Sequence, residues 1–225
     1  ALRRKAWRTD TVYLLLNGAV VRLLMLGVVA AVVAVRPLVT PEGVGRLVSG
    51  QPLWLQTIEL IAVADLGFYL CHRLMHAVPF LWRFHSVHHS IETMDWLASF
   101  RVHPLDQIAT ATASLVPILF LGFSEWAVAA YVLIYRWQSL LLHSNVNLRL
   151  GGLSRWIATP EFHHWHHSVD RPAWDKNFSG QLAFWDVLFG TAYLPKGQIS
   201  TGFGIEDPMP DGYVDQLAHP FRRKP

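Results

Sequence analysis

The segment HRLMHAVPFLWRFHSVHH, residues 72–89, places five histidines within eighteen positions. Their spacing is H-x-x-x-H followed by H-x-x-H-H, and a second H-x-x-H-H group occupies residues 163–167. The chain holds 12 histidines among 225 residues, and nine of them fall in these two regions, which is far from random scatter. Neutral imidazole is the commonest protein ligand for iron, zinc, copper and nickel, so a metal site is the first hypothesis.

The composition is typical of a membrane protein. Hydrophobic residues make up 52% of the chain and charged residues only 16%, against about 25% charged in an ordinary soluble domain. The single cysteine, Cys71, excludes an internal disulfide, a cysteine-ligated iron–sulfur cluster and a cysteine-rich zinc site. The net charge of +3 and the lack of a recognition motif for DNA or RNA favour contact with lipid headgroups or an acidic protein over nucleic acid.

Four apolar segments predict membrane-spanning helices. A helix of about 25 residues reaches about 37 Å, which is enough to cross a bilayer with some tilt. We therefore expect an all-α fold, with an integral-membrane four-helix bundle and a cytosolic histidine-rich helical cap, in one domain of residues 1–225. A cleaved signal peptide is the alternative for the first segment, but its apolar core should be shorter. The predicted spans are residues 11–35, 53–76, 105–122 and 125–143, and the cap is residues 80–104 and 144–225.

The order of these segments predicts which side of the membrane carries the histidines. Spans one and two would meet at a loop, residues 36–52, and spans three and four at residues 122–124. The histidine-rich regions and both termini would then lie on the opposite side, together with most of the basic residues, whereas the two loops hold only Arg36 and Arg46. The positive-inside rule assigns the basic side to the cytoplasm. We therefore expect a multi-pass protein with cytoplasmic N and C termini and its histidines at the cytoplasmic membrane surface.

The spacing of the histidines suits two metal ions. On a helix His72 and His76 lie one turn apart and can bind one ion. In each H-x-x-H-H group we expect the first and fourth residues to converge and the adjacent histidine to serve a second ion. A zinc site needs only three or four ligands, so nine imidazoles fit two ions better than one. The predicted ligands are His72, His76, His85, His88, His89, His143, His163, His166 and His167. Spacing alone leaves iron, zinc, copper and nickel open.

An ordered set of motifs resembles the fatty acid hydroxylase/sterol desaturase superfamily of integral-membrane di-iron oxygenases. The resemblance covers about residues 55–195. It implies a di-metal centre of two iron ions, with zinc as a substitute in a purified sample, and O2 as co-substrate for hydroxylation or desaturation of a lipid. The motifs are HRLMH (72–76), HSVHH (85–89), RVHPLD (101–106), HSN (143–145), TPEFHHWHH (159–167) and DKNFSGQLAFWDVLFGT (175–191).

One motif departs from a branch of that superfamily. There the third motif is H-x-x-x-H, whereas here Asn147 stands where the second histidine would be, four residues after His143. Asn147 is a poor substitute ligand, so His103, a water molecule or an open position would complete the site.

Several other residues are candidates for supporting the ligands. Metal-bound imidazoles usually donate their second N–H to a carboxylate or carbonyl, and Asp65 shares a helical face with His72 and His76. Arg136, within the fourth predicted span, would need a partner such as Asp65 or Glu59. The supporting candidates are Asp65, His103, Asn145, His164, Asp175 and Asp186.

The resemblance also implies the partners. The substrate would be a membrane lipid (fatty acyl, aminolipid or sterol), entering from the bilayer between the helices, and electrons would come from a ferredoxin, a cytochrome b5-like protein or a reductase docked on the basic face. Aromatic residues would line the tunnel or form an interfacial belt. These aromatic residues are Trp54, Phe68, Tyr69, Trp96, Trp126, Tyr131 and Trp137.

Three functions of other classes compete with this hypothesis. A metal transporter or sensor should have ligands at mid-membrane, along a path between helices, and not at span ends. A bis-histidine haem carrier has no use for two H-x-x-H-H groups. A zinc-dependent hydrolase of the common type needs H-E-x-x-H, which the sequence lacks.

Overall fold

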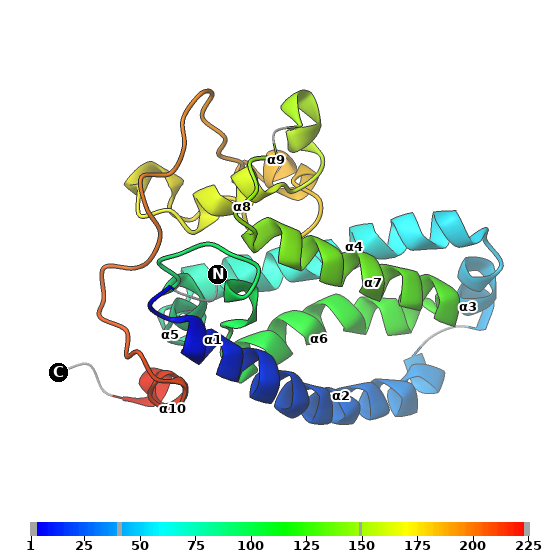
Figure 1. Cartoon of the computed structure of the whole chain (residues 1–225). Coiled ribbons are helices and arrows are strands. Elements are labelled where there is room, and N and C mark those ends of the chain that lie inside the picture. The colour runs from blue at the N-terminus through cyan, green and yellow to red at the C-terminus, as the bar shows by residue number, and fades with distance from the viewer. Residues whose placement is uncertain (1–3, 40–41, 149, 223–225) are drawn as a thin grey trace.

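The computed structural model describes residues 4–39, 42–148 and 150–222, and all its regular elements in these ranges are helices (Figure 1). A single isolated bridge pairs Ser168 with Phe203. The all-α prediction is therefore confirmed. Within the described residues, two helices are long and apolar enough to cross a membrane, Trp7–Arg36 and Leu53–Ala77.

Four long helical segments lie side by side and correspond to the four predicted spans. The first is continuous through α1, a π-helical segment and α2, and α6 packs between α2 and α4, which in turn contacts α7 (Figure 1). The bounds are α1 Trp7–Val12, η1 Tyr13–Asn17, α2 Gly18–Val39, α4 Leu53–Ala77, α6 Pro104–Leu121 and α7 Glu125–His143. The sequence thus predicts the position of each long helix, because apolar length is the dominant signal.

The turn between α6 and α7 is set by local residue chemistry. Gly122 ends α6 with a φ of +77°, a left-handed conformation that favours glycine. The hydroxyl of Ser124 then accepts a hydrogen bond from the amide of Ala127 and caps α7. A Cβ on Gly122 would lie 2.7 Å from Arg36 Nη2 and 2.8 Å from the Cα of Gly45, so this turn packs against the connection between α2 and α4.

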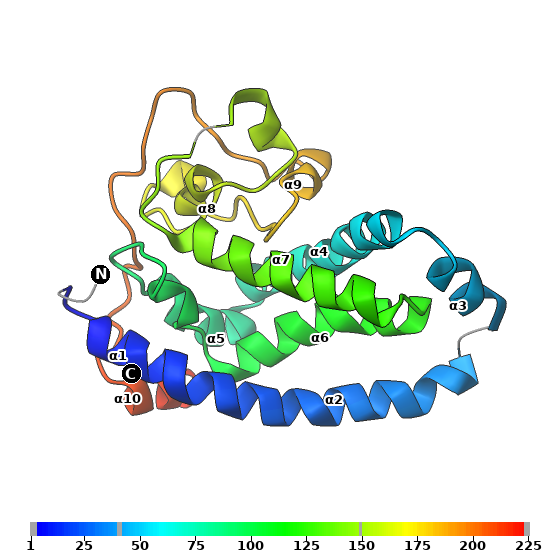
Figure 2. The ribbon, with the colours of Figure 1, turned by 45° about the vertical axis from the view of Figure 1, so that its right-hand side comes forward.

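That connection differs from the prediction. We expected residues 37–52 to form a loop because proline and glycine are frequent there, but α2 continues to Val39 and a short helix, α3 (Glu42–Ser49), follows. Both connections nevertheless lie at one end of the long helices, as Figures 1 and 2 show for α3.

The opposite end carries the histidine-rich elements. Helix α5 begins at Pro79, which breaks α4, and α8 begins after Thr159, whose hydroxyl accepts from the amide of Phe162. Figure 2 shows α1, α5 and α10 at this end, with α8 and α9 packed above α7. The remaining helices are α5 Pro79–His89, α8 Pro160–His166, α9 Phe184–Leu188 and α10 Tyr213–Ala218, and the short 3₁₀ turns are Ala98–Phe100, Gly151–Arg155, Arg171–Ala173 and His219–Phe221. Arg3, Arg149, Arg223 and Lys224, which enter the charge argument for sidedness, lie outside the described residues.

The outer faces of the long helices are apolar and exposed. Trp126 and Trp137 on α7 are 78% and 76% exposed, and Leu23 on α2 is 70% exposed. Many exposed apolar side chains on a soluble protein would promote association, whereas in a bilayer they face lipid.

A buried group of charges fixes the first helix to the histidine end. Asp10 is fully buried and accepts hydrogen bonds from Arg4 and from Arg101 Nε, the latter at 2.5 Å. Arg4 also binds Asp95 at 2.6 Å. In the same region, Asn17 of the π-helical segment donates to the carbonyl of Val102 at 2.7 Å. These contacts join α1 to the segment between α5 and α6.

Helices α4 and α6 approach so closely at Gly67 that a methyl group there would lie 2.1 Å from the carbonyl oxygen of Ala113. We predict that Gly67→Ala forces the helices apart and lowers the free energy of unfolding by about 1–3 kcal/mol. The midpoint of thermal unfolding in detergent measures this. Gly27→Ala on α2 is the control, because its methyl group would meet nothing within 4 Å. Equal midpoints for the two variants would contradict the close packing.

Candidate metal centre

The nine predicted ligands meet at the histidine end in two groups, and within each group the candidate ligand atoms all lie within 4.8 Å of one another. We call them the five-histidine group and the four-histidine group. The first consists of His72, His76, His85, His89 and His166, and the second of His88, His143, His163 and His167. The groups adjoin: the rings of His89 and His167, one from each, stack with centroids 4.5 Å apart.

Helix geometry distributes each H-x-x-H-H motif between the two groups. In α5, His85 and His89 face the five-histidine group while His88 faces the other. The motif at 163–167 reverses this, because His163 and His167 face the four-histidine group and His166 the five-histidine group. The prediction that the first and fourth residues converge is therefore wrong. Residues four apart are offset by only about 40° around a helix, so the first and fifth residues share a face.

The outward nitrogen of most rings is held by a hydrogen-bond acceptor. In the five-histidine group, Nδ1 of His72 donates to the carbonyl of Phe178 at 2.6 Å and Nδ1 of His166 to that of Lys176 at 2.7 Å. His85 Nδ1 binds the buried carboxylate of Asp106 at 2.8 Å. These acceptors fix the orientation and the tautomer of the rings.

Three further rings are oriented by acceptors at Nδ1, one by a carboxylate and two by backbone carbonyls. His76 Nδ1 donates to Asp175 at 3.2 Å. In the four-histidine group, Nδ1 of His88 donates to the carbonyl of Arg101 at 3.0 Å and Nδ1 of His143 to that of Ser139 at 2.9 Å.

These bonds decide what the inward nitrogens can do. A carbonyl or carboxylate oxygen only accepts, so the Nδ1 facing it carries the proton and Nε2 of the same neutral ring carries a lone pair. Yet the Nε2 atoms of His72 and His85 lie 2.9 Å apart, and those of His88 and His143 lie 3.3 Å apart. Two lone pairs at such distances cannot hydrogen-bond to each other. A cation between them removes the conflict, so the residues fit a bound metal ion in both groups.

Burial keeps the rings in the form that binds metal. Burial, together with neighbouring imidazoles, lowers the pKa of His88 to about 3 and holds the pKa of His85 and His89 well below its usual range. The same causes lower the pKa of His163 and His167. Neutral imidazole is the ligand form, so these rings need no deprotonation near pH 7.

Some ring nitrogens have no protein partner among the described residues. Nε2 of His166 and Nδ1 of His163 and His167 are buried without a hydrogen bond. Buried polar atoms normally have partners. His166 Nε2 belongs to a ring whose Nδ1 already donates to Lys176, so its lone pair is available to an ion.

A single loop, residues 175–182, holds three rings of the five-histidine group. It supplies the Asp175 carboxylate for His76 and the carbonyls for His166 and His72. Asp175 and Asn177 adopt positive φ angles of 54° and 59°, a conformation that asparagine and aspartate tolerate better than most residues. The Asn177 amide donates to the carbonyls of Phe162 and Tyr193, both at 2.8 Å, and so locks the turn in place.

Two buried aspartates fix this loop, and neither contacts an imidazole. Asp65, which is 2% exposed, accepts from the amides of residues 180–182 at 2.7–2.9 Å. Asp186 accepts from the amides of Phe178 and Ser179, both at 2.8 Å. The prediction that Asp65 or Asp186 contacts a ligand ring is therefore wrong, because both carboxylates bind backbone amides of the loop.

Other supporting candidates lie outside the two groups. His103 uses Nδ1 to accept from the amide of Leu105 and Nε2 to contact the carbonyl of Leu217, so it has no nitrogen left for an ion. Asn145 and Asn147 are exposed. His164 packs its ring against Phe203. His103 caps α6 and Asn145 is exposed in a loop, so neither supports a ligand as predicted. Motif spacing reveals neither helix capping nor loop exposure.

Sequence reasoning missed Asp106 as the partner of His85, although Asp106 ends the motif RVHPLD (101–106). Its position in the first turn of α6 is a common place for aspartate, so only burial distinguishes it. The predicted partner of Arg136 is Asp65 or Glu59, but Arg136 is exposed, while Asp65 accepts from backbone amides and Glu59 accepts from Gln51. The tunnel aromatics Trp54, Trp126 and Trp137 lie on the outer surface, which fits the alternative of an interfacial belt.

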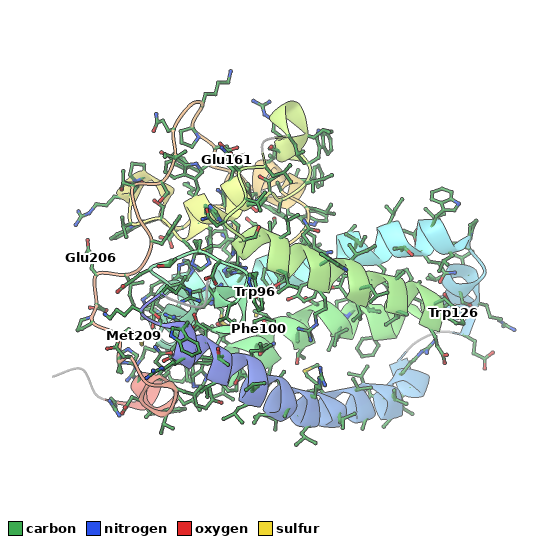
Figure 3. All side chains as sticks on the ribbon, in the orientation of Figure 1. Trp96, Phe100, Trp126, Glu161, Glu206 and Met209 are labelled. Carbon is green, nitrogen blue, oxygen red and sulfur yellow. The ribbon has the colours of Figure 1, made fainter. Side chains whose placement is uncertain are left out.

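A cavity of about 400 Å³ reaches the five-histidine group through His76, His89 and His166. Its walls include Trp82 and Trp174, and none of the four-histidine residues lines it. Figure 3 shows Glu206, a residue of its rim, at the opposite end of the molecule from Trp126. The cavity thus opens at the histidine end of the fold.

Comparison with known proteins agrees with the motifs. The family model for fatty acid hydroxylase matches residues 57–191, which is more than half of the chain. This range includes all nine predicted metal ligands. The chain belongs to the fatty acid hydroxylase family. The resemblance drawn from the ordered motifs is confirmed.

Two relatives of known name illustrate the family. Ornithine lipid hydroxylase OlsE of Rhizobium tropici is 35% identical over 179 residues, which is 77% of this chain and 52% of the relative. Human alkylglycerol monooxygenase is 36% identical over 129 residues, which is 56% of this chain and 28% of the relative. The chain therefore spans about half or less of the length of these relatives. No solved structure matches.

Asp106 gives a test of ring orientation. We predict that Asp106→Asn weakens metal binding at the five-histidine group by about 10–100-fold, because His85 loses a charged acceptor. Asp175→Asn should have a smaller effect, because the Asp175 side chain is 74% exposed and water can replace it. Competitive chelator titration measures both affinities. An equal or reversed order of the two effects would contradict the role given to Asp106.

Asp65 gives a test of the loop. In Asp65→Asn an NH₂ group must face at least one backbone N–H, so the loop should loosen and the five-histidine group should lose its ion while the four-histidine group retains one. Metal per chain after dialysis against a weak chelator should fall from two to one. Glu59→Gln, another carboxylate of α4 that accepts from Gln51, is the matched control and should retain two. Loss of both ions or of neither would refute this division.

Proposed function

We propose that the chain is an O2-dependent di-iron hydroxylase that acts on an unactivated C–H bond of a membrane lipid. The observation that carries the proposal is the pair of adjoining all-histidine groups, each with ring nitrogens that converge on one point. The printed names of the relatives, a hydroxylase and a monooxygenase that act on lipids, support the same reaction class.

Iron is the metal that this reaction favours. Zinc has no redox chemistry, so zinc in a purified sample would fill the groups without activity. Two iron ions bound there would supply the oxidising power to place one atom of O2 into a C–H bond, while two electrons and two protons from outside reduce the other atom to water. Imidazole ligands leave no thiolate at the centre to be oxidised.

The protein residues orient the ligands and exclude water. Asp106, Asp175 and the backbone carbonyls keep the inward nitrogen unprotonated in six of the nine rings. His72 and His85 are 2% and 3% exposed, so bulk water is excluded from their shared space. The cavity gives a substrate access to one side of the five-histidine group.

The membrane placement follows from the apolar helices. We infer that α2, α4, α6 and α7 cross the bilayer, that residues 1–225 form one domain, and that the histidine end faces the cytoplasm with both termini. The exposed apolar faces and the bias of basic residues support this orientation. A ferredoxin, cytochrome b5-like protein or reductase would then deliver electrons at the cytoplasmic end.

The proposed substrate class, membrane lipids, includes more than the lipids named for the relatives. Aminolipids and alkylglycerols come from the names of the relatives, and fatty acyl lipids and sterols from the family resemblance. Desaturation of a lipid is the alternative outcome of the same chemistry. A metal transporter or other non-enzymatic metal protein is less well supported, because both histidine groups lie at helix ends and not along a path between the helices.

One variant in each group tests the proposal. We predict that His88→Ala and His166→Ala each lower bound iron and reduce lipid oxidation to background, because each removes one ligand. Metal analysis and mass spectrometry of a lipid extract incubated with O2 and reductant measure both effects. His164→Ala, in the same cluster but outside both groups, should keep its iron. Full turnover in either ligand variant would defeat the assignment.

A further inference from the structure

The two histidine groups differ in their access to the outside. The cavity of about 400 Å³ contacts His76, His89 and His166. No residue of the four-histidine group lines this cavity, and all four of its histidines are at most 7% exposed. A volume of this size is within the range of small-molecule sites, roughly 300–1,000 Å³. One group is therefore open to a ligand and the other is enclosed by protein.

Trp82 forms the wall of the cavity nearest to the histidines. Its ring lies against His76 and His89, with centroid distances of 5.0 and 5.2 Å. It therefore stands where a ligand in the cavity would approach these two rings. Trp174, whose indole N–H donates to the carbonyl of Val169, lines the cavity from another segment.

One edge of the cavity is continuous with the apolar surface of the long helices. Pro79 lines the cavity at the junction of α4 and α5. Its neighbours Val78 and Phe80 are 37% and 60% exposed, and Leu74 on the last turns of α4 is 54% exposed. An apolar chain at the end of α4 would therefore meet exposed apolar side chains beside Pro79.

Another part of the wall is formed by a chain segment that packs against the protein body. Ile205, Glu206 and Asp207 line the cavity, and the preceding Phe203 packs against the apolar cluster that contains Ile91 and Met94. The cavity wall thus combines apolar groups at Pro79, Trp82 and Trp174 with acidic groups at Asp175, Glu206 and Asp207, which suits an amphiphile.

We propose that this cavity is the lipid-binding site, that the reacting C–H bond is presented to the five-histidine group, and that Trp82 determines which carbon is presented. The inference rests on the proposed function, since it assigns the substrate of that function to one face of the centre. The four-histidine group does not contact the lipid.

Trp82 variants test which carbon reacts. Trp82→Ala opens the wall beside His76 and His89, so the chain should slide and the hydroxyl should appear at more than one carbon, with kcat/KM lower by about tenfold. Trp82→Phe, which keeps an aromatic wall, should retain most of the product at the wild-type position. Tandem mass spectrometry of the product gives the position, and metal analysis verifies that both variants hold the wild-type amount of iron.

Trp126→Ala is the matched control, because Trp126 is exposed at the far end of α7 (Figure 3). It should change neither the product position nor KM. If fully metal-loaded Trp82→Ala gives the wild-type product and KM, the cavity does not hold the lipid and admits only O2 or water.

A binding experiment tests the site without turnover. In a Cys71→Ser background, Ile205→Cys places one thiol in the cavity wall, and an alkylglycerol or an ornithine lipid in detergent micelles should slow its alkylation by a maleimide. Leu153→Cys, at an exposed position that does not line the cavity, should show no such protection. Absence of protection by both lipids would overturn the site. Protection without lipid oxidation by the wild-type protein would instead overturn the proposed function and retain the site.

Discussion

The hydrogen bond from an outward histidine nitrogen to a fixed acceptor is the interaction on which the rest of the site depends. A histidine in a helix can present either nitrogen, and only the acceptor at Nδ1 decides that Nε2 carries the lone pair. The acceptors come from parts of the chain far apart in sequence, namely Asp106, the Arg101 carbonyl and the 175–182 loop. The fold therefore has to place these segments before the rings can converge.

This requirement explains several buried charges that do not touch the histidines. Asp65 and Asp186 use their carboxylates on backbone amides of residues 178–182, and one of these, the Ser179 amide, belongs to the same peptide unit as the Phe178 carbonyl that faces His72. At the other group, Arg101 binds Asp10 of α1 through its side chain while its carbonyl holds His88. A buried ion pair adds little net stability. Its role here is to position Arg101, which links α1 to the four-histidine group.

The sequence predicts the long helices and the nine converging histidines because both signals are local. Apolar length defines α2, α4, α6 and α7, and the clustering of histidines marks segments that meet at the centre. The sequence does not predict which histidine serves which group, since this depends on how α5 and α8 are rotated against each other. Nor does it identify Asp106 or the carbonyls of Lys176 and Phe178, because a backbone acceptor has no signature in residue type. His103 and Asn145 were misplaced for the same reason, as nearness in a motif does not give the direction of a side chain.

With the long helices in the proposed membrane position, the cost of burying polar groups explains why the centre lies at the ends of these helices. Nine imidazoles and the charges that orient them would each need a partner in the hydrocarbon region, whereas at the helix ends loops can supply carbonyls and amides. The same location lets a cavity open beside the apolar surface of α4 at Pro79. A site deeper in the bundle would have no irregular backbone to hold His72 and His166, and a site further out would lie away from the proposed path of the lipid. The junction of α4 and α5 meets both conditions, which is why the histidine-rich segment 72–89 spans that junction.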